Sequence, residues 1–296
     1  FRPVLLVPRE RLHDSGLDVK GPGRSVSMVV WMSWRSGNHA IAGIWHEGTD
    51  LAYKGELAKR VEPGMRQYAL FAGLAANSGA VAAHVSENGR NSFGDKYARN
   101  ISVTPDRIPT AGDDPDAAWC TAGMVYDNRR RTVTSYLNGE AKDYWIEEPE
   151  KHPFFQWPAK AWGRADGSYA PPEGKPRKRR VLFNDGARRV VLEEYEFTKV
   201  RATYEKGQRE PVQRQLAALR VNPFWFGHDL YAPARLAEGG PFTIGRVIHS
   251  GRNPGIAAYI GGVAVYGRAL STPEMRKLAR VGMKRRNRKW MAAPLE

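Results

Sequence analysis

Residues 119–139 read WCTAGMVYDNRRRTVTSYLNG, and this stretch decides the fold class. Strand-forming β-branched and aromatic residues are frequent in 119–126 and 131–137, on either side of the polar segment 127–130. This order is typical of a β-hairpin, in which a short polar turn joins two antiparallel strands. The Asn138-Gly139 pair predicts a second turn directly afterwards. The stretch therefore predicts antiparallel β-structure.

Further strands are predicted on both sides of this hairpin. Apolar segments bounded by Gly, Pro, Asn and Asp lie at 26–34, 40–45, 67–74, 79–85, 190–197, 242–249 and 257–266. We expect a long loop over 88–117 and a short helix over 208–220. A closing helix is predicted over 271–280, because Ser271 and Glu274 have the spacing of a capping box. Short strands with turn residues between them indicate an all-β chain with two packed antiparallel sheets.

The composition is that of a globular protein with a strongly basic balance. The 296 residues include 46 Lys and Arg against 31 Asp and Glu, which gives a formal net charge of +15. Basic residues cluster at 175–180 and again at 276–289. One interpretation is a solvated loop and a soluble helical tail; the other is an electrostatic footprint for an anionic ligand. Familiar nucleic-acid-binding motifs are absent from the sequence, so we do not expect nucleic acid as a partner.

The sequence also excludes several classes of protein. Cys120 is the single cysteine, which excludes an internal disulfide framework and cysteine-rich zinc modules. No apolar run approaches the length of a membrane-spanning helix, so we predict no membrane span. The chain begins at Phe1 rather than Met. We expect that a leader has been removed and that the protein is secreted, periplasmic or on the cell surface.

Three blocks of the sequence, in order, resemble one superfamily. The hairpin 119–139 resembles the middle of a laminin-G-like domain, with Tyr126-Asp127 before its turn and Tyr136-Leu137 after it. The block 260–271, IGGVAVYGRALS, resembles the last strand and closing helix of the same concanavalin A-like superfamily. The strand at 26–34 resembles its opening strand. The resemblance implies a jelly-roll sandwich of two antiparallel sheets, one of them concave, with long loops and a short C-terminal helix.

The resemblance also sets the expected organisation and function. We expect a single domain over 1–296, with an elaborated loop region at about 140–240 and a basic tail at 281–296. The superfamily contains lectins, adhesion modules, glycoside hydrolases and polysaccharide lyases, so the fold alone does not choose among them. We expect binding of a polysaccharide or oligosaccharide, and the basic surplus favours an anionic one. The alternatives are a lyase or glycoside hydrolase acting on an acidic polysaccharide, and a protein-interaction module.

Four residues are candidates for lyase catalysis. Such an enzyme needs groups that transfer protons and a cation beside the uronate carboxylate. His84 is the candidate base, because its strand neighbours on the same face are small and imidazole titrates near neutral pH. His228 and Tyr231 are candidates for a second proton carrier, and Arg246 for the neutralising cation. The competing interpretation is that these are unrelated polar residues of loops and sheet faces.

Four other residues are candidates for contacts with a sugar. Trp225, in the aromatic segment 221–241, and Trp45, at the end of an early strand, offer rings on which a sugar can stack. Asn88, just after the strand of His84, and Arg252 are the polar candidates. For each aromatic residue, packing in the core or anchoring a loop is the competing interpretation.

Carboxylates supply the remaining candidates. Glu194 and Glu196 would share one face of a strand over 190–197, as the acid and nucleophile of a glycoside hydrolase do. The family resemblance also allows a calcium ion, for which Asp113, Asp114 and Asp116 form the densest group of oxygens. Their spacing matches no known calcium loop, so we predict no ligand set.

Overall fold

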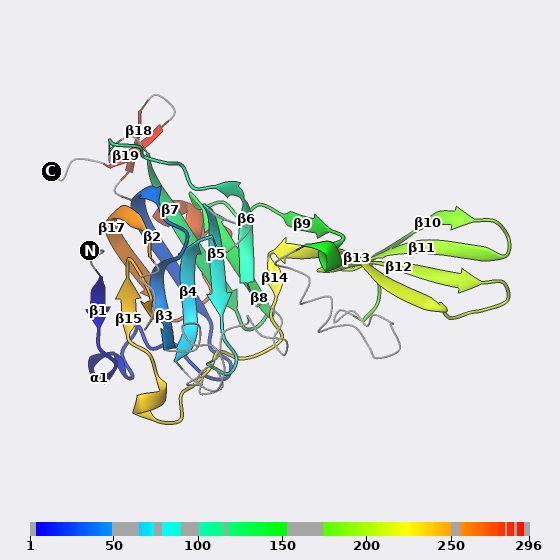
Figure 1. The fold of residues 1–296 in the computed structure, drawn as a ribbon, viewed down its shortest axis with the longest axis horizontal. Coiled ribbons are helices and arrows are strands. Elements are labelled where there is room, and N and C mark those ends of the chain that lie inside the picture. Colours follow the sequence, from blue (N-terminus) through cyan, green and yellow to red (C-terminus); the bar gives the residue numbers. More distant parts are fainter. Residues whose placement is uncertain are drawn as a thin grey trace. The chain divides into compact units, whose positions relative to one another are not determined.

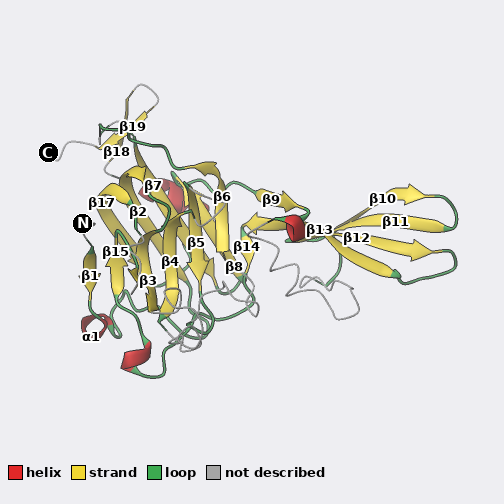
Figure 2. Ribbon diagram, viewed as in Figure 1, coloured by secondary structure: helices red, strands yellow, loops and turns green. Residues whose placement is uncertain are grey.

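A computed structural model gives the fold. The structure describes residues 4–48, 65–73, 79–89, 101–114, 116, 118–152, 174–249, 255–281, 283–286 and 289–292. The chain divides into two compact units: the first has Phe1–Asn91, Asn100–Lys142 and Asn222–Glu296, and the second has Ser92–Arg99 and Asp143–Val221. Both units consist mainly of β-strands, as Figure 1 and Figure 2 show.

In its described part, the first unit is a jelly-roll sandwich of two sheets. Sheet 1 has the order β1-β15-β3-β4-β5-β6, with the short β16 parallel to β3. Its strands are β1 (Leu5–Val7), β15 (Phe242–Ile244), β3 (Ala40–Gly48), β4 (Arg66–Ala72), β5 (Ala80–Val85), β6 (Ile101–Arg107) and β16 (Ile248–His249). Sheet 2 has the order β14-β8-β7-β2-β17, with β14 (Phe224–Trp225), β8 (Thr132–Leu137), β7 (Trp119–Asp127), β2 (Val26–Ser36) and β17 (Ala257–Tyr266).

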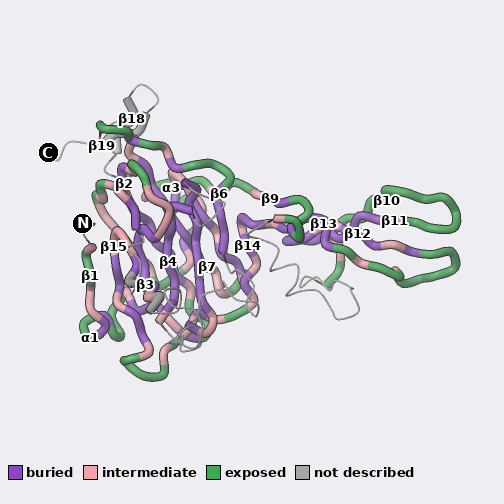
Figure 3. The backbone as a smooth tube through the Cα atoms, viewed as in Figure 1, coloured by how far each residue is buried: buried purple, intermediate pink, exposed green. Residues whose placement is uncertain are grey.

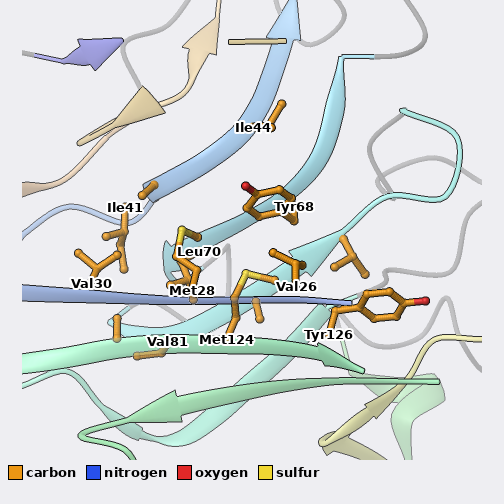
Figure 4. Packing of buried hydrophobic residues seen from close by; sticks show 14 of the residues in the cluster. Val26, Met28, Val30, Ile41, Ile44, Tyr68, Leu70, Val81, Met124 and Tyr126 are labelled. Carbon is orange, nitrogen blue, oxygen red and sulfur yellow. The ribbon is translucent and has the colours of Figure 1, made fainter. Parts of the chain in front are cut away.

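The hydrophobic core lies between these two sheets. Met28 and Val30 of β2 face Tyr68 and Leu70 of β4, and all four are fully buried (Figure 4). The inner strands of the first unit are therefore buried along most of their length (Figure 3). Each large apolar side chain buried in this way contributes about 1.5–3 kcal/mol relative to an exposed one.

The predicted turn and closing helix of the first unit are confirmed. Asn138 and Gly139 both have positive φ angles, 53° and 74°, as a tight turn requires. Helix α3 (Thr272–Ala279) has the predicted capping box: the Ser271 hydroxyl accepts from the Glu274 amide, and the Glu274 carboxylate accepts from the Ser271 amide. Met275 of α3 packs on the face of sheet 2 that is turned away from the main core. Near the N-terminus lies the short helix α1 (Arg9–Leu12).

The described part of the second unit is a smaller antiparallel sheet, sheet 3, with the order β10-β11-β12-β13-β9. Its strands are β9 (Tyr144–Glu147), β10 (Lys178–Asn184), β11 (Arg188–Glu194), β12 (Thr198–Glu205) and β13 (Gln213–Asn222). Side chains on β12 alternate between buried and more exposed positions, so one face of the sheet holds a small core of Val200, Ala202 and Tyr204. Sheet 3 falls within the region for which the sequence predicts an elaborated loop.

Several predicted elements are wrong. The segment 208–220 is not a helix: its Leu and Ala spacing suits one, but pairing with β12 makes it the strand β13. The predicted loop 88–117 contains the strand β6. Pro105 made a strand unexpected there, but β6 pairs with β5. The predicted strand 242–249 breaks at Gly245, where φ is 93°.

The two basic clusters also differ from the simplest expectation. The cluster at 175–180 was expected in a loop, but its last residues begin the exposed strand β10, held by pairing with β11. The C-terminal segment was expected to be helical. After α3 it instead forms the hairpin of β18 (Met283–Arg286) and β19 (Lys289–Ala292), whose backbones pair. No helix in the described part of the chain is long and apolar enough to cross a membrane.

Candidate functional site

Strand β5 places His84 on the face of sheet 1 that turns away from the core. Along β5, Val81, Ala83 and Val85 contribute to the core between the sheets. His84 lies on the opposite face, directly across from Ala69 of β4. We call this face of sheet 1 its outer face. His84 therefore shares a face of β5 with Ala82 and Ser86, as the two-residue period predicts, but the expected room for a substrate beside it is filled by the rings of Trp45 and Phe71.

Aromatic rings gather around His84 on the outer face. The rings of Trp45 and His84 are 4.2 Å apart between centroids, and Phe71 lies 5.7 Å from Trp45 and 6.0 Å from His84. The guanidinium carbon of Arg66 lies 6.0 Å from the centre of the Trp45 ring. His39 contacts Phe71 edge-on at 5.4 Å. Aromatic surface and hydrogen-bonding groups are thus combined in one cluster.

These side chains are closed off from solvent. Trp45 is 2 % exposed, His84 1 %, and Phe71 and Arg66 0 %. Burial of an arginine and a histidine costs free energy unless each is hydrogen-bonded. An apolar residue would fill the same position on a sheet face without that cost. Both residues have partners within the protein, so they belong to a buried cluster of the folded unit.

A polar rim follows where β5 ends. The Tyr231 amide donates to the Ser86 carbonyl at 2.9 Å, so the loop after β14 crosses the end of β5. The His228 imidazole Nε2 lies 2.8 Å from a carboxylate oxygen of Glu87. Asn88 follows in the same turn and is partly exposed. We call the ring cluster Trp45, Phe71 and His84, together with the rim Ser86, Glu87, Asn88, His228 and Tyr231, the β5 site.

The electrostatics of the rim are set by two carboxylates. The hydrogen bond with Glu87 raises the pKa of His228 above its ordinary value of 6.5, and this outweighs the opposing effect of partial burial. Asp229 accepts hydrogen bonds from Asn128 at 2.6 Å and from Arg131 at 3.1 Å, which lower its pKa. The Tyr126 hydroxyl donates to the His228 carbonyl at 2.6 Å. These bonds fix the loop that carries His228.

The other predicted residues lie elsewhere or outside the description. Trp225 is on β14 at the edge of sheet 2, and its ring packs so closely over Gly227 that a Cβ there would come within 2.4 Å of it. Arg246 follows β15 and forms a bridge with Gly255. Because β3 and β4 separate β15 from β5, the structure does not bring Arg246 to His84. Arg252 lies outside the described residues.

The predicted carboxylate sites have other arrangements. Strand β11 ends at Glu194, and a turn closed by the Tyr195 amide and the Thr198 carbonyl takes Glu196 off the strand, where it pairs with Arg177. The prediction that Glu194 and Glu196 share a strand is therefore wrong.

The aspartates proposed for calcium also have partners within the protein. Asp113 pairs with Arg35, Asp114 accepts from the Asp116 amide, and Asp116 accepts from the Trp119 indole. Among the described residues, no group of three or more His, Cys, Asp or Glu side chains is placed to hold a metal ion. The structure thus gives no observation in favour of a calcium site.

A separate cavity of about 720 Å³ lies beside β17, away from the β5 site. It is lined almost entirely by aliphatic residues and glycines of 4–5, 244–245 and 256–263, together with Tyr259. Its charged residue, Arg35, is bonded to Asp113 and to the Gly112 carbonyl. A sugar needs several hydrogen-bonding groups in its pocket, so this groove suits a glycan poorly.

Sequence reasoning missed Glu87 and Phe71 of the β5 site, and Arg66 beside Trp45. Glu87 follows the His84 strand, but its partner His228 comes from a distant loop, and no local pattern predicts that contact. Phe71 could have been found, since it lies on the same face of β4 as Ala69, which is opposite His84. Arg66 pairs with Trp45 across an irregularity in the β3–β4 ladder, which sequence periodicity does not reveal.

The sequence matches no family model, and no curated protein is similar enough in sequence to count as a relative. Similar solved structures exist. The native heptameric SAP-like pentraxin from Limulus polyphemus is 10% identical with a TM-score of 0.35, covering 86% of this chain and 70% of that chain. A point mutant of the NanB sialidase from Streptococcus pneumoniae is 12% identical with a TM-score of 0.41, covering 93% of this chain and 26% of that chain.

The carbohydrate-binding module CBM40 of the Ruminococcus gnavus IT-sialidase has been solved with α2,3-sialyllactose bound. It is 11% identical with a TM-score of 0.30, covering 86% of this chain and 83% of that chain. This chain spans about a quarter of the length of the NanB sialidase structure. Likenesses as distant as these do not indicate what this chain binds.

Proposed function

We propose that this protein binds a carbohydrate at the β5 site. The observation that carries the proposal is the partly exposed rim of Glu87, Asn88 and His228, in which the His228 imidazole lies 2.8 Å from the Glu87 carboxylate. Sugars are bound by a few oriented hydrogen-bonding groups together with aromatic rings. The rings of Trp45 and Phe71 are buried, so the polar rim supplies the groups that a sugar can reach.

The net charge of +15 favours an acidic glycan over a neutral one. A charged surface attracts an anionic polymer over a distance set by the ionic strength. We further propose that the protein acts outside the cytoplasm, where such polysaccharides occur. Nucleic acid, the other common polyanion, is the less favoured partner, because the sequence has none of the familiar motifs for it.

A glycan panel tests the proposal. Uronate-containing, sulfated and neutral oligosaccharides are titrated into the full chain by calorimetry, and the tightest ligand is carried forward. Glu87→Gln should weaken its binding about tenfold, because the variant loses the charge that orients His228. The side chain of His228 is 57% exposed, so the melting temperature should change little.

Glu140→Gln is the matched control. Glu140 pairs with the cation Arg276 and is also accessible to solvent, its side chain being 49% exposed against 24% for Glu87, but Arg276 belongs to α3, which packs on sheet 2. The control variant should bind the glycan as the wild type does. If no glycan on the panel binds, or if both variants lose affinity equally, carbohydrate binding at the β5 site is ruled out.

One observation favours a polysaccharide lyase as a second candidate function. The His228 imidazole is held by a carboxylate and is open to solvent, which is how a proton-transferring histidine is commonly oriented. His84 is the candidate base. Incubation with uronate polymers should then produce the ultraviolet absorbance of an unsaturated uronate, and His84→Ala should abolish this. An unchanged rate in His84→Ala would remove that residue from the mechanism.

A further inference from the structure

A second cavity, of about 350 Å³, lies at one end of sheet 3, within the second unit. The β10–β11 and β12–β13 hairpins both turn at this end of the sheet (Figure 1). Residues of both turns and of the adjoining strands line it: Asn184, Gly186, Ala187, Arg188, Arg189, Tyr204, Glu205, Lys206, Gly207 and Gln208. We call this cavity the hairpin pocket.

The lining of the hairpin pocket is strongly cationic. It includes Arg188, Arg189 and Lys206, whereas Glu205 is the one carboxylate among its lining residues. Within the described part of the chain, none of these three cations forms an ion pair. Most other arginines of sheet 3 are neutralised, as Arg179 is by Glu193 and Arg220 by Asp143. The charge of the pocket is therefore available to a ligand.

The two arginines are held in place by aromatic rings. The Arg188 guanidinium lies 5.4 Å from the centre of the Phe183 ring, and that of Arg189 lies 4.9 Å from the centre of the Tyr204 ring. Stacking of this kind orients the planar group but leaves its N–H donors at the edge unused. Those donors suit a carboxylate or a sulfate, which a guanidinium binds through paired hydrogen bonds.

The size of the pocket indicates more than a bare anion. A water molecule occupies about 30 Å³ of liquid volume, and a small inorganic anion is only a few times larger. The pocket falls at the lower end of the range for small organic ligands. The Asn184 Oδ1 accepts from the Gly186 amide, which leaves the Asn184 amide nitrogen and the Gln208 side-chain amide to bond hydroxyl groups. We infer that the hairpin pocket binds an acidic sugar, one that carries a carboxylate or a sulfate.

Nuclear magnetic resonance of the full chain tests this inference. Glucuronate, glucose 6-sulfate, glucose and inorganic sulfate are titrated separately, and the backbone amide signals of 184–189 and 204–208 are followed. The two acidic sugars should give saturable shifts at these amides, and glucose should give none. Arg189→Gln should raise the dissociation constant of the acidic sugars about tenfold, because a charge-assisted hydrogen-bond pair is lost.

Arg180→Gln is the matched control, since Arg180 is an exposed arginine of β10 that does not line the pocket. Arg180→Gln should leave the affinity for the acidic sugars unchanged. Arg189→Lys should have an affinity between those of the wild type and Arg189→Gln. Shifts with glucose equal to those with glucuronate would overturn the inference. So would inorganic sulfate binding as tightly as the sugars, equal loss in Arg180→Gln, or tighter binding of an oligonucleotide than of an acidic oligosaccharide of equal charge. Because Glu87 is not altered, the outcome is independent of the β5 site.

Discussion

The β5 site and the hairpin pocket differ in whether their exposed basic side chains are paired with carboxylates. At the β5 site the exposed imidazole of His228 is paired with Glu87, and the rings of the cluster are buried. In the hairpin pocket the arginines are exposed and stack on rings, and none pairs with a described carboxylate. The first arrangement favours recognition by shape and hydrogen bonds. The second favours recognition by charge, which salt screens.

The two sites also differ in how a substitution should affect the stability of the fold and the affinity for a ligand. Buried rings support the fold around them, so changes to the ring cluster of the β5 site should lower stability, whereas changes to its exposed rim should not. Exposed cations contribute little to folding, so changes in the hairpin pocket should affect affinity alone. The following predictions address this contrast in order of expected effect.

Removal of a buried ring should give the largest effect. Trp45→Ala should lower the free energy of unfolding by about 3–5 kcal/mol, because a fully packed indole is replaced by a cavity. Arg189→Ala in the hairpin pocket should lower it by less than about 1 kcal/mol. Urea denaturation followed by circular dichroism measures both. Similar losses of unfolding free energy in the two variants would contradict the proposed difference between the sites.

Acid should weaken the first unit through Asp18. Burial would raise the pKa of this carboxyl, but hydrogen bonds from Arg9, Lys20 and Gln67 outweigh it and lower the pKa from 3.8 to about 2. A lowered pKa stabilises the fold above pH 3.8, and this contribution is lost as the pH falls toward 2. Its size is about 2 kcal/mol.

Denaturation in urea between pH 5 and pH 2 measures this loss. The wild type should lose stability over the lower half of this range, and Asp18→Asn, though less stable throughout, should show a flatter dependence. The same slope in both proteins would mean that Asp18 does not carry the acid sensitivity. The hairpin pocket has no comparable buried pair, so Arg189→Gln should leave the slope unchanged.

The smallest effect should come from His228. Its raised pKa means that the ion pair with Glu87 is complete below pH 6.5 and is lost as the pH rises through the raised value. Glycan affinity at the β5 site should then change by about twofold to fivefold between pH 6 and pH 8.5, because an exposed pair is weak. Calorimetry at several pH values measures this, and in Glu87→Gln the midpoint of the change should move down toward the ordinary imidazole value of 6.5. A midpoint that stays unchanged in Glu87→Gln would assign the titration to another group.

Much of the sandwich could be predicted because local patterns specify it. The hairpin at 119–139 and the capping box of Ser271 and Glu274 depend on residues close together in the chain, and the structure has both. The segment 208–220 could not be predicted in this way. Its composition suits a helix, and only pairing with β12 makes it a strand.

The candidate site was predictable only in part, for a similar reason. The position of His84 on the outer face follows from the two-residue period of β5. Its contact with Trp45 depends on the register of β3 and β4, which contains irregularities at Ala40/Ala42 and Ile44/Trp45. The contact between Glu87 and His228 joins distant segments. The hairpin pocket required the register of sheet 3, since Arg189 meets Tyr204 only across a ladder.

The most direct test of carbohydrate binding at the β5 site is a map of where the glycan touches the protein. The tightest ligand from the panel is titrated into isotope-labelled protein, and amide and indole signals are recorded. The account predicts saturable shifts at the amides of Ser86, Glu87 and His228 and at the Trp45 indole, all reduced in Glu87→Gln. Shifts confined to the aliphatic groove beside β17, or to α3 on sheet 2, would contradict it.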